Sequence, residues 1–187
     1  MRTRSRIHVP RRLWAPLALV ATLAATLFPS APALSDTPPA GPHYTWSQTP
    51  SKVWLQRPDE SFLRLKPWTY CWEAPPEEHG ESVTVCVDGI PPERDEMKRL
   101  TSASATRFWF GRPGWEFNAS FASLNSPDDE SCRSHVATLQ PRPRWFRLPR
   151  PERPGAYQVD MFGSGPEGDV FVTFKWRVGR WDSVNAC

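Results

Sequence analysis

The chain has 187 residues, 22 prolines, ten tryptophans, four cysteines and a formal net charge of +3. That length fits one domain, with or without a tail. Five of the 23 basic residues and none of the 20 acidic ones lie in residues 1–33, so the remainder carries a formal charge of −2. A basic protein that binds nucleic acid is therefore not expected, and the frequent prolines argue against a helical bundle.

The first 33 residues have the order of a secretory signal peptide. An arginine-rich start, Met1–Arg12, precedes an uncharged apolar run, Leu13–Phe28, and the small residues Ala31-Pro32-Ala33. The apolar run is shorter than the roughly 20 residues that span a bilayer. We therefore expect cleavage after Ala33, a secreted protein at the cell envelope or outside it, and no membrane attachment afterwards. An uncleaved signal anchor is the alternative.

Residues 34–50 are rich in Pro, Ser and Thr, show no periodicity, and are predicted to be a flexible leader. Residues 51–187 are predicted to form one domain. There, short runs rich in β-branched and aromatic residues alternate with Pro and Gly clusters, which predicts an all-β, immunoglobulin-like antiparallel sandwich of roughly seven to nine strands. The runs are 53–57, 61–66, 68–73, 82–87, 106–111, 115–121, 134–139, 144–148, 156–162 and 169–178.

Two of these runs alternate between apolar and polar residues, which indicates strands with one buried face. The buried residues expected for 115–121 and 169–178 are Trp115, Phe117, Ala119, Phe121, Val170, Val172, Phe174, Trp176 and Val178. Residues 94–100 follow two prolines and carry acids before bases, so a turn or two of helix is expected there. Residues 163–166 lie between two predicted strands and are interpreted as part of a hairpin connection.

The segment Gly155–Val159 resembles the start of strand F in immunoglobulin-like and fibronectin-like domains. In those domains a tyrosine at this corner bonds back to the backbone, a role that falls to Tyr157 here. The antibody pattern would place a cysteine two residues after the tyrosine, where this chain has Val159. The likeness favours a sandwich in general over an antibody-type domain.

Cys71, Cys86, Cys132 and Cys187 in an exported chain indicate disulfides. Three connectivities are open, and we favour Cys71–Cys86, which joins neighbouring predicted strands, with Cys132–Cys187, which would hold the C-terminus. A Cys187-linked dimer is an alternative, although a monomer is expected. No C-x-x-C pair or histidine at ligand-like spacing favours zinc, so we predict no metal and no cofactor.

No catalytic motif stands out in the sequence. The chain has no G-x-S-x-G elbow and no phosphate-binding glycine loop followed by lysine. Glu73, Glu116, Asp160 and Asp182 could supply the paired carboxylates of a glycosidase, but charged residues on the polar faces of strands usually contact only solvent. We therefore predict a protein that is not an enzyme.

The tryptophans and one arginine-rich stretch are the candidates for binding. A small sandwich cannot bury every tryptophan completely, and exposed aromatic residues form platforms for sugars or proteins. Residues 142–153 hold five arginines and one acid, which favours a solvated edge or a surface for an anionic cell-wall polymer over nucleic acid. The candidate binding residues are Trp68, Trp72, Trp109, Trp145, Arg144 and Arg147.

Three stretches, residues 65–72, 86–92 and 154–176, together resemble a group of small exported proteins of actinobacteria. These are described as secreted proteins, lipoproteins or immunoglobulin-like extracytoplasmic domains. The resemblance implies export, a sandwich and a Cys71–Cys86 bridge, and it supplies no catalytic or ligand residues. This chain departs from the lipoprotein members because no cysteine follows the expected cleavage site.

These observations predict a secreted, non-enzymatic module that binds a protein or an envelope glycan. A carbohydrate-binding accessory protein that uses Trp68, Trp72 or Trp109 is one alternative. An exported protease inhibitor that presents a proline-rich loop is a second. A hydrolase built on scattered carboxylates is a third, and it is the least favoured.

Overall fold

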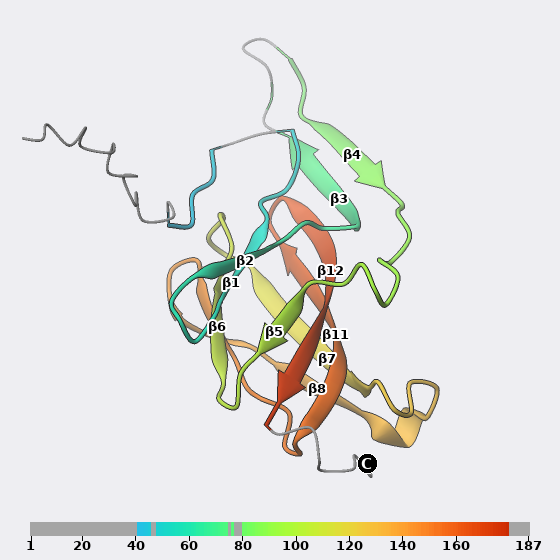
Figure 1. Ribbon diagram of the computed structural model, residues 1–187. Coiled ribbons are helices and arrows are strands. Elements are labelled where there is room, and N and C mark those ends of the chain that lie inside the picture. The colour runs from blue at the N-terminus through green and yellow to red at the C-terminus, as the bar shows by residue number, and fades with distance from the viewer. Residues whose placement is uncertain (1–40, 46–47, 75, 77–79, 180–187) are drawn as a thin grey trace, which may run out of the picture. The chain divides into compact units, whose positions relative to one another are not determined.

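A computed structural model describes residues 41–45, 48–74, 76 and 80–179 of the protein (Figure 1). All of them belong to one structural unit. Within them lie twelve strands and one short 3-10 turn, η1 (Glu130–Cys132). The predicted signal peptide, residues 1–33, lies outside the described residues. No helix in the described ranges is long and apolar enough to cross a membrane.

A five-stranded antiparallel sheet has the order β2-β1-β6-β10-β9. Each of its strands has four residues, and β9 joins β10 through only Pro143 and Arg144. The strands are β1 (Val53–Gln56), β2 (Phe62–Leu65), β6 (Thr106–Trp109), β9 (Leu139–Arg142) and β10 (Trp145–Leu148).

A seven-stranded sheet has the order β4-β3-β12-β11-β7-β8. The seventh strand, β5, pairs in parallel with the C-terminal part of β12, at residues 175–177. Its centre is a long hairpin of two 11-residue strands, in which Pro166 and Glu167 form the turn. This confirms the hairpin expected around residues 163–166. The strands are β3 (Thr69–Ala74), β4 (Val83–Val87), β5 (Arg99–Thr101), β7 (Glu116–Ser123), β8 (Arg133–Ala137), β11 (Gly155–Gly165) and β12 (Gly168–Val178).

The inward side chains of both sheets form one hydrophobic core, which makes the fold a β-sandwich. Phe108 and Phe146 of the five-stranded sheet stack on each other and meet Phe117 of the opposite sheet edge to face, at centroid distances of 5.0 and 4.9 Å. The alternation predicted for residues 115–121 and 169–178 is confirmed, because every expected inward residue is at most 2% exposed. The all-β sandwich predicted from the sequence is thus confirmed.

The structure has more strands than the seven to nine expected. Each of the ten apolar runs contains a strand, and the two additional strands are β5 and β9. Neither has an apolar alternation that could be read from the sequence. Three-residue β5 has one buried side chain, Leu100, and β9 includes Pro141 and is exposed along its whole length.

The helix expected over residues 94–100 is not formed. The carbonyl of Glu93 accepts hydrogen bonds from the N–H groups of Glu96 and Met97, at 3.0 and 3.1 Å, which makes a single turn. The chain then enters β5, because Leu100 is buried in the core and Lys175 of β12 donates its N–H to the Lys98 carbonyl. Tertiary pairing with β12 therefore overrides a weak local helical preference.

Tyr157 forms the corner expected from the sequence. Its hydroxyl donates to the carbonyl of Arg153 at 2.9 Å, while its ring packs against the core beside Phe121. Burial raises the pKa of the phenol, and the nearby Arg153 cation acts in the opposite direction. The hydrogen bond holds the proline-rich segment before β11 against the sandwich.

Replacing Tyr157 by phenylalanine is expected to lower the free energy of unfolding by about 1 kcal/mol at pH 7, because one hydrogen bond is lost. The folded protein holds the phenol proton more tightly than the unfolded chain, so wild-type stability should fall as the pH rises beyond about 10. Tyr157→Phe should show a shallower fall. Urea unfolding at several pH values measures both effects.

Tyr70→Phe is the matched control. Tyr70 is also packed against the core, but its hydroxyl makes no hydrogen bond within the described residues. Equal losses of stability for the Tyr70 and Tyr157 variants would contradict a special role for the corner.

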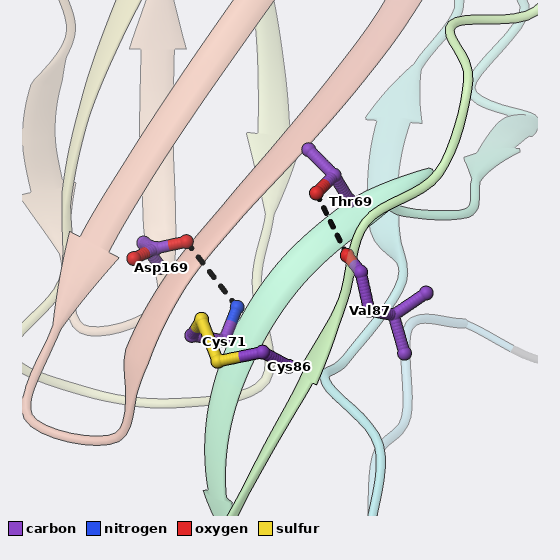
Figure 2. Close-up of a disulfide and its surroundings, with 5 residues drawn as sticks. All are labelled: Thr69, Cys71, Cys86, Val87 and Asp169. Carbon is purple, nitrogen blue, oxygen red and sulfur yellow. Dashed lines mark hydrogen bonds between the residues drawn. A yellow bond between two sulfur atoms is a disulfide. The ribbon is translucent and has the colours of Figure 1, made fainter.

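The predicted Cys71–Cys86 disulfide is present and joins β3 to β4 (Figure 2). Its two cysteines are direct partners in the register, so the bridge links facing positions of one hairpin. The Cys132–Cys187 pair stays a prediction, because Cys187 lies outside the described residues. Within the segment expected to be a flexible leader, the Tyr44 ring packs against the core, 6.5 Å from that of Trp72.

Candidate functional site

Three tryptophans lie side by side on the outer face of the five-stranded sheet. Trp54 of β1 pairs with Trp109 of β6, which in turn pairs with Trp145 of β10. Register partners at the two ends of this row are arginines: Arg64 of β2 faces Trp54, and Arg142 of β9 faces Trp145. The row thus crosses all five strands and ends in a cation on both sides.

The next position along the sheet brings two further arginines together. Arg107 of β6 and Arg147 of β10 are direct cross-strand partners, and both are exposed. Neither forms a salt bridge with an acid in the described part of the chain. Like charges directly opposite each other destabilise a sheet, so this pair costs stability unless an anion lies between them. We call the surface formed by Trp54, Arg64, Arg107, Trp109, Arg142, Trp145 and Arg147 the arginine–tryptophan face.

A groove of about 490 Å³ runs over this face. A second hollow of about 570 Å³ adjoins it, and Arg147 lines both. No acidic residue lines either one. The groove is lined by Gln56, Arg107, Pro141, Arg142, Trp145 and Arg147.

Ring packing makes the floor of the face rigid. The Arg64 guanidinium lies 4.5 Å above the centre of the Trp54 ring, in a cation–π contact. Phe62 bridges the row, at 6.0 Å from Trp54 and 6.2 Å from Trp145. His43 covers Trp54 from the N-terminal side at 5.2 Å. Trp54 and Trp109 are only 4% and 7% exposed, whereas Trp145 is half-buried.

Arg144 occupies the tight turn that precedes Trp145. It has a φ of 66°, a region that non-glycine residues seldom adopt, and it follows Pro143. Proline followed by a residue of positive φ is typical of a type II turn, where glycine or asparagine is preferred. The carbonyl of Arg144 accepts a hydrogen bond from Phe110 at 2.9 Å, which holds the turn in place. The exposed Arg144 side chain is thus carried on a fixed turn beside the arginine–tryptophan face.

The Asp59 carboxylate, in the turn between two strands of this sheet, is hydrogen-bonded within that turn. Asp59, between β1 and β2, accepts hydrogen bonds from the hydroxyl of Ser61 at 2.6 Å and from its N–H at 3.1 Å. The hydroxyl bond, followed by the backbone bond, holds the pKa of Asp59 below its usual value. Asp59 is therefore ionised at neutral pH and is held by Ser61.

The structure brings together three of the six residues selected from the sequence and separates the others. Trp145, Arg144 and Arg147 lie together at the arginine–tryptophan face. Trp109 belongs to the same row but is covered by its neighbours, so it offers little surface to a ligand.

Trp72 has no exposed surface. Its position in β3 points into the core, where its ring stacks on Trp115 at 5.7 Å. It is therefore not available for binding, contrary to its selection as a candidate.

Trp68 lies on the outer face of the other sheet. Its ring is 5.8 Å from Phe171, which in turn lies 4.6 Å from Phe162, and all three side chains are half-buried. The Trp68 indole N–H donates to the Thr173 hydroxyl at 3.1 Å. This makes a second, smaller aromatic surface without the arginines of the first.

Sequence reasoning did not select Trp54, Arg64 and Arg107 as binding residues. They come from β1, β2 and β6, far from the arginine-rich stretch, and only the register places them beside β10. The available signal was the alternation of β1 and β2, each with two inward residues that belong to the core, and of β6, whose inward Phe108 also belongs to it. The remaining side chains of those strands then point outward.

Glu116 and Asp160, two of the carboxylates considered for hydrolysis, are not assembled as a catalytic pair. Glu116 faces Ser164 on β11, while Asp160 lies four positions further along that strand, so about 13 Å separates the two positions. Glycosidases need carboxyl groups about 5 to 9.5 Å apart. Asp160 instead accepts hydrogen bonds from Thr173 and Gln158. Glu73 accepts one from Ser82, and Asp182 lies outside the described residues.

Across the described ranges, no group of three or more His, Cys, Asp or Glu side chains could hold a metal ion. No family model, curated protein or solved structure matches the chain.

Proposed function

We propose that the protein is an exported, non-enzymatic binding module whose arginine–tryptophan face holds an anionic polymer of the cell envelope. The ligand class is a chain that carries repeated phosphate or carboxylate groups. The observation that carries the proposal is the Arg107–Arg147 pair, two cross-strand arginines that both line a groove in which no acid is present.

An anion between two facing guanidinium groups would turn their repulsion into attraction. Guanidinium groups bind phosphate and carboxylate through two parallel hydrogen bonds, which are stronger than bonds between neutral groups. The half-buried Trp145 ring lies next to Arg142 and Arg147 in the same groove. It offers an apolar surface for the uncharged part of a polymer unit.

The extent of the surface favours a polymer over a single small anion. Arg64 and Arg142 lie at opposite ends of the tryptophan row, and Arg147 also lines the neighbouring hollow with Arg150. A backbone conformation that costs of order 1 kcal/mol is kept at Arg144, where glycine would be free of strain. An arginine retained there is consistent with use of its side chain.

Export is supported by the sequence of residues 1–33 and by the Cys71–Cys86 disulfide, because disulfides persist in oxidising compartments. A location at the envelope would place the face next to anionic surface polymers.

The double variant Arg107→Gln/Arg147→Gln is expected to bind poly(glycerol phosphate) about 10- to 30-fold more weakly, because two charge-assisted contacts are lost. Wild-type affinity should fall as salt is raised, since surface charges are screened. Isothermal titration calorimetry with the mature protein measures both effects, and neutral dextran should give no heat.

Arg99→Gln/Arg177→Gln is the matched control, because it removes the same charge from β5 and β12 of the other sheet. The proposal fails if both double variants bind equally well. It also fails if dextran binds as tightly as the charged polymer.

The carbohydrate-binding alternative rests on one observation, the half-buried Trp68–Phe171–Phe162 surface. Under that alternative the wild-type protein binds dextran and Trp68→Ala weakens the binding, whereas under our proposal neither protein binds dextran. The protease-inhibitor alternative gains little support from the segment before β11, where Pro151 is buried and the Arg153 carbonyl is bonded to Tyr157.

A further inference from the structure

The strand β4 is an unprotected edge of the seven-stranded sheet. It pairs with β3 on one side only, and Figure 1 shows no strand beyond it. All five of its residues are exposed. Edge strands with unpaired backbone groups are templates for another strand, and proteins usually protect them with charge, proline or a bulge.

Every other outer strand of the two sheets carries such protection. β2 contains Arg64, β8 contains Arg133, and β9 contains Pro141 and Arg142 and pairs irregularly with β10. The short β5 contains Arg99. The sequence of β4, Val-Thr-Val-Cys-Val, has no charge and no proline. This edge is therefore the exception among the described strands.

The alternation of the hairpin fixes which backbone groups of β4 are available. Cys71 and Cys86 are facing partners with a Cα–Cα distance of 4.1 Å, which matches the close spacing of a non-hydrogen-bonded pair. The N–H and C=O groups of Cys86 therefore point away from β3, as do those of Thr84 two residues before it. Val83, Val85 and Val87 bond inward to β3 instead.

The side chains beside this free edge are apolar. Val83, Val85 and Val87 share one face of the strand and are 59%, 37% and 39% exposed. Ile90, just beyond the strand, is 88% exposed. A strand added alongside would cover this row with its own alternate side chains.

The residues around β4 are acidic, which favours a basic strand as its partner. From Pro67 to Glu93 the sequence contains no lysine or arginine. Glu81 precedes β4, Asp88 follows it, and Glu73 faces Thr84 across the hairpin. Two copies of β4 would bring these acids together, which disfavours self-pairing.

The hairpin is held ready to accept a partner. The disulfide links β4 to β3 at Cys86, and the Thr69 hydroxyl donates to the Val87 carbonyl at 2.7 Å (Figure 2). The N–H of Cys71 is in turn bonded to the Asp169 carboxylate of β12 at 3.3 Å. A strand fixed in this way loses little conformational entropy on binding.

We infer that β4 is a docking edge for an extended polypeptide segment of a partner protein, with β-branched residues at alternate positions and basic residues at its ends. The segment adds a strand to the sheet through the Thr84 and Cys86 backbone groups. The site is separate from the arginine–tryptophan face and does not depend on its function.

A fluorescein-labelled peptide Lys-Val-Thr-Val-Thr-Val-Lys is the probe, and binding to the mature protein is followed by fluorescence anisotropy. Hydrogen exchange should show new protection at the Thr84 and Cys86 amides and little change at Val83, Val85 and Val87. The same peptide with glutamate in place of lysine should bind at least about tenfold more weakly, because the flanks of β4 are acidic.

Thr84→Pro removes an outward N–H without touching the bonds to β3, as proline does at natural sheet edges. It should weaken peptide binding at least about tenfold, whereas the matched variant Thr84→Val, which keeps the N–H, should not. The hydrogen-exchange result on the wild-type protein stands even if Thr84→Pro fails to fold.

Equal affinity of the Thr84→Pro and Thr84→Val proteins would overturn the inference. Protection at Arg107 and Arg147 in place of β4 would do the same. Dimerisation in sedimentation velocity, with Thr84 and Cys86 already protected in the absence of peptide, would show that a second copy occupies the edge.

Discussion

Replacing Glu167 by alanine is expected to lower the free energy of unfolding by about 2–4 kcal/mol, because a buried indole donor loses its acceptor and the ion pair with the partly exposed Arg112 is broken. Glu167 lies in the β11–β12 turn and is only 8% exposed. Its carboxylate accepts a hydrogen bond from Arg112 Nε at 2.6 Å and another from the Trp115 indole N–H at 2.7 Å. Without it, the buried Trp115 donor has no acceptor, and the Arg112 contact is lost.

Glu167→Gln removes the negative charge of the side chain but keeps its size, so it measures the contribution of the charge alone. The amide keeps one oxygen for Trp115 but loses the negative charge beside Arg112, so about half of the loss is expected. Glu116→Ala, on the exposed face of β7, should change stability by less than about 0.5 kcal/mol. Guanidinium unfolding followed by tryptophan fluorescence measures all three. A loss below about 1 kcal/mol for Glu167→Ala would show that the turn does not depend on this carboxylate.

Removing the disulfide with Cys71→Ala/Cys86→Ala is expected to cost about 3 kcal/mol, because the bridge closes a loop between cysteines 15 residues apart. The loss should be concentrated in β4, which has no other strand neighbour than β3 in the described structure. Global unfolding measured with guanidinium should shift, and hydrogen exchange in β4 should accelerate more than in β11 and β12.

The Cys71→Ala/Cys86→Ala variant also tests whether the disulfide is needed for peptide binding at β4. If β4 accepts a peptide because the bridge holds it rigid, the variant should lose peptide binding while polymer binding at the arginine–tryptophan face is unchanged. Val85→Thr, which changes an exposed β4 side chain but keeps the bridge, is the stability control. Uniform acceleration of exchange over both sheets would contradict a local role for the disulfide.

The fold class could be predicted because strands with one buried face have a period of two. The alternate positions of Phe117, Phe121, Phe174 and Trp176 were enough to predict which face of β7 and of β12 is buried. The hairpin turn at Pro166 and the corner tyrosine were also local signals, since each depends on residues close in the chain. β5 was not readable, because its pairing with β12 is parallel and distant in sequence.

The candidate site was only partly predictable for the same reason. Trp145, Arg144 and Arg147 are neighbours in sequence, and the arginine-rich stretch marked them. A cross-strand partner is set by register, and no composition or spacing in the sequence reports which residue lies opposite. Arg107 therefore appeared only once β6 was placed beside β10.

By itself, the sequence determined the class of this protein: a β-sandwich with a signal-like start, a near-neutral remainder and cysteines in neighbouring strands. Those properties follow from periodicity and composition, which are local. Only the tertiary structure decided which tryptophans are covered, which arginines face each other and which edge is left open. Burial and pairing depend on residues distant in the chain. Trp72 is therefore in the core while Trp145 lines a groove, and β4 is the one outer strand of the described structure without a protecting charge or proline.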